Sequence, residues 1–127
     1  MRASLKFFVV FACLSAALSI AVSAAAAHAL TLSAQDAHAM AWALDLQRFH
    51  ALALLLLVLF ARQGGANRWT LLTGALGVAG TLLFSINIEL RLLFDLAQGR
   101  AWVPYGGMAW MAAWLTMAIA CWPARER

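Results

Sequence analysis

The length of the apolar runs constrains this chain more than any other feature. The first run extends from Phe7 to Ala27 and contains 21 residues. As an α-helix it would measure about 31 Å, which matches a hydrocarbon core of about 30 Å. Runs of comparable length occupy residues 42–61, 69–90 and 103–122. Hydrophobic residues form 65% of the 127-residue chain, more than a soluble domain of this size can bury. We therefore predict one all-α membrane domain over residues 1–127, a bundle of four spanning helices.

The first run has an alternative interpretation as a signal peptide. MRASLK resembles the basic segment of such a peptide, and AVSAAAA contains small-residue cleavage sites. However, the apolar core of a signal peptide is usually about 7–15 residues long, which is shorter than this run. We therefore expect the first span to be retained.

An amphipathic segment is expected to precede the second span. Ser33 begins LSAQD, and Asp36 follows three residues later, a pattern typical of a helix N-terminus. Polar residues recur on one side of the segment from Ser33 to Arg48, while alanine and leucine occupy the other side. This pattern predicts a helix that lies at the membrane interface and leads into the second span.

Basic residues flank the apolar runs and predict the orientation of the chain. If the N-terminus is cytoplasmic, the cytoplasmic side holds six of them: Arg2, Lys6, Arg62, Arg68, Arg125 and Arg127. The opposite side holds three: Arg48, Arg91 and Arg100. The difference predicts that both ends are cytoplasmic. Because the basic residues form no run, the net charge of +4 does not indicate a nucleic-acid partner.

In this orientation, polar residues gather toward the non-cytoplasmic face. The candidate polar cluster consists of His28, Asp45, Gln47, Arg48, His50, Ser85, Asn87 and Glu89. Polar groups at bilayer depth usually point into a bundle or toward water. One interpretation is that these side chains tie helix ends together; the other is an outer polar pocket with His28 and His50 as proton or metal ligands. We expect the two histidines to meet in one cluster with Glu89.

The residues do not form a recognisable catalytic or metal site. Cys13 and Cys121 lack the spacing of a metal site, and no nucleophile or second carboxylate accompanies Glu89. We therefore predict no enzyme activity, no metal and no cofactor.

Glycines mark two expected helix contacts. GALGVAG contains Gly74, Gly77 and Gly80, and VPYGG contains Gly106 and Gly107. Small residues let membrane helices approach closely. We expect all five to serve helix packing within the bundle, with Gly77 at a close contact; homo-oligomerisation is the alternative.

Several segments together resemble a known family. They are AHAL at 27–30, LSAQD, QRFHALALLLL at 47–57, FS at 84–85 and VPYGGMAW at 103–110. In these segments the chain resembles the domain of unknown function 423 family of small bacterial membrane proteins, whose eukaryotic relatives are called transmembrane protein 256. The resemblance covers about residues 5 to 122. The chain departs from the family pattern at AAAA before AHAL, at INIELR after FS and at Val103.

The resemblance implies the fold and a membrane location, but the family has no assigned activity. We therefore predict a multi-pass protein of the bacterial inner membrane with a structural or accessory role. Its partners are the lipid bilayer and either another membrane protein or further copies of itself. One alternative is a small transport or proton-handling protein that uses the outer-side polar pocket. The other is a haem- or quinone-associated subunit that uses His28 and His50.

Overall fold

A computed structural model describes residues 1–122, and helices form nearly all of this part of the chain. The α-helices are α1 (Arg2–His28), α2 (Ala34–Gly64), α3 (Arg68–Thr81), α4 (Asn87–Leu93) and α5 (Val103–Ala120). A π-helix, η1 (Leu82–Ile86), joins α3 to α4, and a short 3-10 helix, η2 (Arg100–Trp102), precedes α5. Residues 1–122 contain no strand, and the all-α prediction is confirmed. Arg125 and Arg127, which contributed to the predicted orientation, lie outside the described residues.

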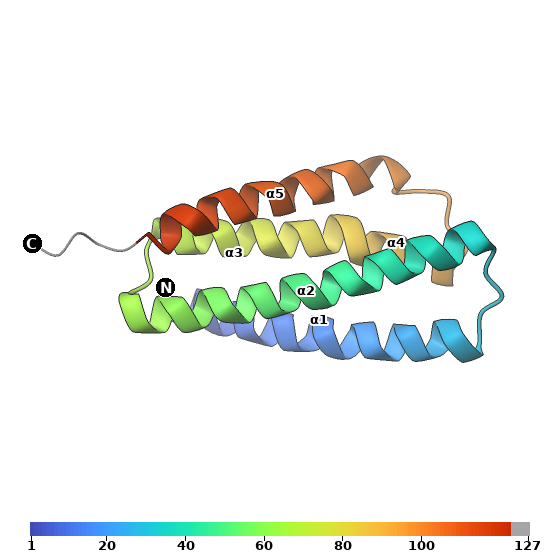
Figure 1. Ribbon diagram of the computed structural model, residues 1–127, viewed down its shortest axis with the longest axis horizontal. Coiled ribbons are helices and arrows are strands. Elements are labelled where there is room, and N and C mark those ends of the chain that lie inside the picture. The colour runs from blue at the N-terminus through green and yellow to red at the C-terminus, as the bar shows by residue number, and fades with distance from the viewer. Residues whose placement is uncertain (123–127) are drawn as a thin grey trace, which may run out of the picture.

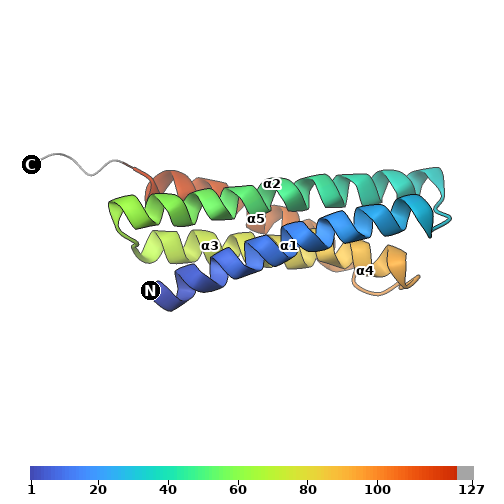
Figure 2. The same cartoon turned by 90° about the horizontal axis from the view of Figure 1, so that it is seen from below.

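The helices run alternately up and down the length of the bundle (Figure 1). The start of α1, the turn at 65–67 and the end of α5 lie at one end, here called the proximal end. The connections at 29–33 and 94–102 lie at the other, distal end. The most extensive interfaces join α1 to α2 and α3 to α5. Figure 2 shows that α1 diverges from α2 toward the proximal end.

Local sequence signals account for the helix ends. The hydroxyl of Ser33 accepts a hydrogen bond from the Asp36 backbone N–H (3.1 Å), so the predicted start of α2 is confirmed. Asn67 caps α3 by accepting from the Trp69 and Thr70 backbone N–H groups. The amphipathic lead-in is continuous with the rest of α2. Its apolar residues Met40 and Leu44 are buried against the distal half of α1.

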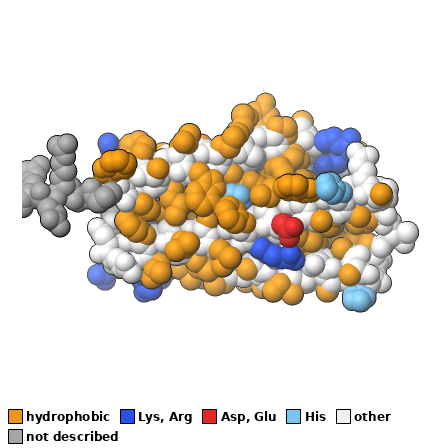
Figure 3. Space-filling view, in the orientation of Figure 1, with side chains coloured by type: hydrophobic (Ala, Val, Ile, Leu, Met, Phe, Trp, Pro, Cys, Tyr) orange, Lys and Arg blue, Asp and Glu red, His pale blue; other side chains and the backbone are white. Residues whose placement is uncertain are grey.

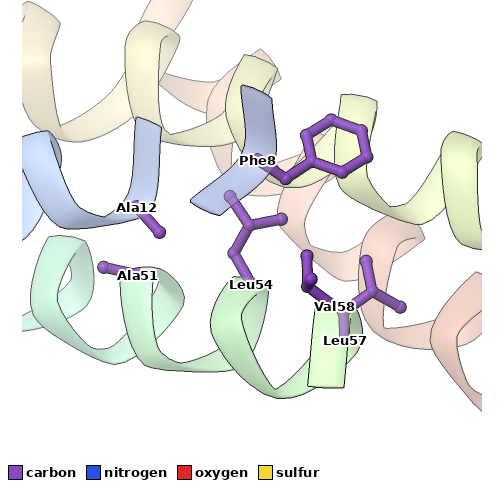
Figure 4. Packing of buried hydrophobic residues seen from close by; sticks show 6 residues of the cluster. All are labelled: Phe8, Ala12, Ala51, Leu54, Leu57 and Val58. Carbon is purple, nitrogen blue, oxygen red and sulfur yellow. The ribbon is translucent and has the colours of Figure 1, made fainter. Parts of the chain in front are cut away.

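The proximal half of the bundle has a hydrophobic core between α1 and α2. It consists of Phe8, Ala12, Ala51, Leu54, Leu57 and Val58 (Figure 4). Alanines at 12 and 51 allow the two helices to approach, while Phe8 extends toward α3. This packing makes α1 an integral part of the bundle.

Three helical segments are long and apolar enough to cross a membrane: Arg2–His28, Ala34–Gly64 and Arg68–Leu93. Large hydrophobic side chains cover much of the surface (Figure 3), including Leu14 and Ile20 of α1 and Leu115 of α5. Such a surface is typical of a protein whose solvent is lipid. α5 lies alongside α3 but is not among the three segments.

The glycines contribute unequally to packing. A β-carbon at Gly74 would collide with the Phe8 ring, and one at Gly80 would collide with the Trp110 ring. A β-carbon at Gly106 would lie 2.6 Å from the backbone nitrogen of Phe84. The expected close contact at Gly77 is corrected, because its nearest neighbour would be Leu54 Cδ1 at 3.9 Å. Gly107 likewise has only an ordinary contact, at 4.0 Å from Phe84. Both face looser parts of the interface.

Candidate functional site

Two side chains of α2 bind the middle of α1. Gln47 is fully buried, and its Nε2 donates to the backbone oxygen of Ser15 (3.1 Å). Arg48 donates from Nε to the Ser19 hydroxyl (3.1 Å) and from a terminal nitrogen to the Ser19 backbone oxygen (3.2 Å). Ser15 lies 13 residues from either end of α1, or about 20 Å. These contacts therefore lie at mid-height of the bundle, with Gln47 buried and Arg48 partly exposed.

A buried carboxyl group lies on α4, which packs against α2. Glu89 of α4 is only 2% exposed, and its Oε1 has no hydrogen-bond partner among the described residues. No cation lies within ion-pair distance of this carboxyl group among the described residues. The one ion pair within 4 Å in residues 1–122 joins Arg48 to Asp45 (3.3 Å), and the Asp45 side chain is 76% exposed. Arg48 is thus paired with the exposed carboxylate, and no ion pair within 4 Å joins it to the buried one.

The π-helix positions a further polar contact. The Ser85 hydroxyl is fully buried and donates to the backbone oxygen of Ala43 in α2 (2.6 Å). The backbone N–H of Asn87 reaches Leu82, five residues earlier, so this turn is wider than an α-turn. π-Turns within α-helices are frequent at functional sites. Here the wide turn directs Ser85 toward α2 and begins the segment that carries Glu89.

We call Ser15, Ser19, Gln47, Arg48, Ser85 and Glu89 the polar core. It includes four predicted cluster residues and two serines that sequence reasoning missed. Three of its buried atoms have no hydrogen-bond partner among the described residues: Ser15 Oγ, Gln47 Oε1 and Glu89 Oε1. Buried polar atoms without partners are uncommon in folded proteins, and each calls for a bound water, an ion or a functional role.

The remaining predicted residues lie outside the polar core. Asp45 is at its exposed rim, and Asn87 donates to the Gly99 backbone oxygen in the distal connection (2.8 Å). His28 is exposed at the end of α1, nine residues beyond Ser19, or about 13 Å along the helix. The expectation that His28 and His50 share one cluster with Glu89 is therefore corrected.

His50 instead belongs to an aromatic group on the α5 side of α2. Its Nδ1 lies 2.8 Å from the Leu46 backbone oxygen, and the indole N–H of Trp114 donates to its Nε2 (3.3 Å). Its ring also stacks on Trp110. Both ring nitrogens are engaged, so the folded site presents neither as a free ligand. The described residues contain no cluster of three histidine, cysteine or acidic side chains.

A groove connects the distal surface with the polar core. It has a volume of about 440 Å³ and lies between the distal halves of α1 and α2. Ala26 and Leu30 line its α1 side, and Met40 and Asp45 line its α2 side. Arg48, the lining residue furthest along α2, marks its inner end. A small polar solute that enters this groove from the distal end therefore passes Asp45 and then reaches Arg48.

Comparison with known proteins identifies the family. The family model described as "Protein of unknown function (DUF423)" matches residues 22–107. The chain belongs to the DUF423 family. The matched region includes Gln47, Arg48, Ser85 and Glu89, whereas Ser15 and Ser19 precede it. No curated protein and no solved structure matches the chain.

Proposed function

We propose that this DUF423 protein is a multi-pass membrane protein that binds and releases a proton at Glu89. The observation that carries the proposal is the burial of this carboxyl group inside a helical segment apolar enough to span a membrane. An ionised carboxylate is costly there, whereas a neutral carboxyl group can donate a hydrogen bond. Ionisable side chains at such positions commonly serve proton or ion pathways.

Arg48 provides the link between Glu89 and the groove. When Glu89 is ionised, its charge attracts the guanidinium inward; when it is protonated, the exposed Asp45 carboxylate becomes the stronger partner. Arg48 contacts Asp45 at 3.3 Å, so this exchange requires the guanidinium to release Asp45 and move toward Glu89, with which it forms no ion pair within 4 Å. In the described arrangement Ser19 also accepts two hydrogen bonds from Arg48.

We extend the proposal to the membrane arrangement. α5 crosses as the fourth span, both ends of the chain are cytoplasmic, and the membrane is the bacterial inner membrane. The six-to-three distribution of basic residues and the pairing of α5 with α3 support this arrangement. The distal groove then opens to the non-cytoplasmic side.

A structural or accessory role is the second candidate, and a different observation favours it. Gln47, Arg48 and Ser85 each form a hydrogen bond between helices, so much of the polar core ties the bundle together. In this role Glu89 would serve packing alone and would not exchange its proton. The haem or quinone alternative receives less support, since both ring nitrogens of His50 have partners.

Infrared spectroscopy of the purified protein tests the proposal. As the pH is raised, the carbonyl band of a protonated carboxyl group should disappear in the wild type, and Glu89→Gln should abolish this change. Asp95→Asn is the matched control, because Asp95 is an exposed carboxylate two residues beyond the end of the same helical segment. An identical titration in the wild type and in Glu89→Gln would contradict the proposal.

Proton flux into liposomes then separates transport from simple proton binding. If the protein conducts protons, a pH-sensitive dye inside the vesicles should respond faster with the wild type than with Glu89→Gln. If the infrared carboxyl band changes with pH but no proton flux is measured, the protein binds protons without transporting them. A flux unaffected by the substitution would show that protons do not pass through Glu89.

A further inference from the structure

The proximal end of the bundle contains a second groove, separate from the polar core. It has a volume of about 880 Å³ and lies where α1 diverges from α2 (Figure 2). Its apolar lining includes Leu5, Val9 and Val10 of α1 and Val58 and Ala61 of α2. The surface is therefore suited to a flexible hydrocarbon chain lying along the two helices.

Basic side chains surround the proximal mouth of this groove. Arg2 and Lys6 come from α1, and Arg62 comes from the last turns of α2. No acidic residue lines the groove, and the first turn of α1 contains none. In residues 1–122 every acidic residue belongs to the distal half: Asp36, Asp45, Glu89 and Asp95. The positive charge at the mouth thus lacks a carboxylate partner within the described chain.

We propose that this groove binds one anionic phospholipid. The phosphate lies among Arg2, Lys6 and Arg62, and an acyl chain lies along Leu5, Val9 and Val58. The positive-inside tendency explains why basic residues lie at this end. It does not explain why three of them, from two helices, surround an apolar groove. Basic pockets between membrane helices are known to bind anionic headgroups.

Native mass spectrometry of the full-length protein in detergent provides the test. Phosphatidylglycerol should bind as one copy per chain and more tightly than phosphatidylcholine of the same acyl composition. Lys6→Gln and Arg62→Gln should each weaken phosphatidylglycerol binding about fivefold. The matched control is Arg68→Gln, which removes a charge from the same end; Arg68 lies over the Trp69 ring and does not line the groove.

Three outcomes would overturn the proposal. Equal binding of the two lipids would show that the headgroup charge is not recognised. An equal loss of phosphatidylglycerol binding in Arg68→Gln would show that the basic surface attracts the lipid in general and that the groove is not a specific site. Displacement of the lipid by inorganic phosphate alone would show that the acyl chain contributes nothing. Circular dichroism of each variant in the same detergent verifies that the bundle is intact.

Discussion

The imidazole of His50 lies parallel to the indole of Trp110, with ring centroids 3.9 Å apart and an interplanar angle of 2°. Trp110 also covers Gly80, the position where a β-carbon would collide with its ring. One buried indole of α5 thus contacts both α2 and α3. This arrangement gives the glycine motif of α3 a specific role, because Gly80 provides the space that Trp110 occupies.

Gly80→Ala should therefore destabilise the bundle. The added methyl group has no space unless Trp110 moves, and overpacking of this kind costs about 1–3 kcal/mol. Gly77→Ala is the matched control on the same helix, with its nearest contact at 3.9 Å. It should leave stability unchanged or raise it, because alanine favours helix more than glycine does. Thermal unfolding in detergent measures both, and equal effects would contradict the assignment.

Ser85→Ala should weaken the contact between the π-helix and α2. The substitution removes a buried 2.6 Å hydrogen bond to the Ala43 backbone oxygen. We expect a loss of about 1 kcal/mol in the free energy of unfolding, the usual scale for such a bond. Ser23→Ala, in the open distal groove, is the control and should have little effect. Unchanged stability of Ser85→Ala would show that this bond does not hold the wide turn.

Arg48 and Glu89 should be energetically coupled. Arg48→Gln removes the Ser19 hydrogen bonds and, under the proposal, the cation that approaches Glu89 when it is ionised, so we expect a loss of about 1–3 kcal/mol. In the double variant Arg48→Gln, Glu89→Gln, part of that loss should disappear, because no buried charge remains. A double-mutant cycle should give a coupling of at least about 0.5 kcal/mol. Strict additivity would show that the two side chains act independently.

The first span should be retained in the mature protein. Phe8 and Ala12 complete the core against Ala51, Leu54 and Leu57, and cleavage near residue 27 would expose those three residues. Intact-protein mass spectrometry should therefore find a chain that includes residues 7–27. A mature N-terminus between Ala24 and Ala29 would contradict this prediction.

The predicted orientation can be tested in cells. A reporter fused after Arg127 should be active only if it is of the kind that functions in the cytoplasm. Activity of a periplasmic reporter at the same position would reverse the proposed topology and place the distal groove on the cytoplasmic side.

Helix positions were accessible from the sequence because they depend on local signals. The apolar runs lie within helices, and Ser33 caps the start of α2 as the pattern predicts. Gln47, Arg48, Ser85 and Glu89 were recognised for a comparable reason, since polar residues are conspicuous in apolar helices. Their burial then follows from the cost of exposing them to lipid.

The partners of these residues could not be predicted, because they depend on how each helix is rotated. Ser15 and Ser19 look like ordinary small residues in the apolar run of α1, yet Gln47 and Arg48 bind at these positions. His50 lies only two residues from Arg48 but on a different side of α2. Its predicted depth in the membrane matched that of the polar cluster, but its side chain contacts the tryptophans of α5 instead. Gly77 fits the glycine pattern but faces a looser part of the interface.

The π-helix at Leu82–Ile86 has a consequence for how this sequence can change. A single π-turn behaves as one residue inserted into an α-helix, so everything after it is rotated by about 100°. The buried position of Glu89 therefore depends on the extra residue in the π-turn as well as on the residue type at position 89. Closing the wide turn to an α-turn without a deletion would therefore rotate Glu89, whereas deleting one residue within 82–86 would restore an α-turn and leave the carboxyl group facing the same way. A relative that lacks both this residue and the wide turn would carry the acidic side chain one residue earlier in its sequence but at the same place in the bundle.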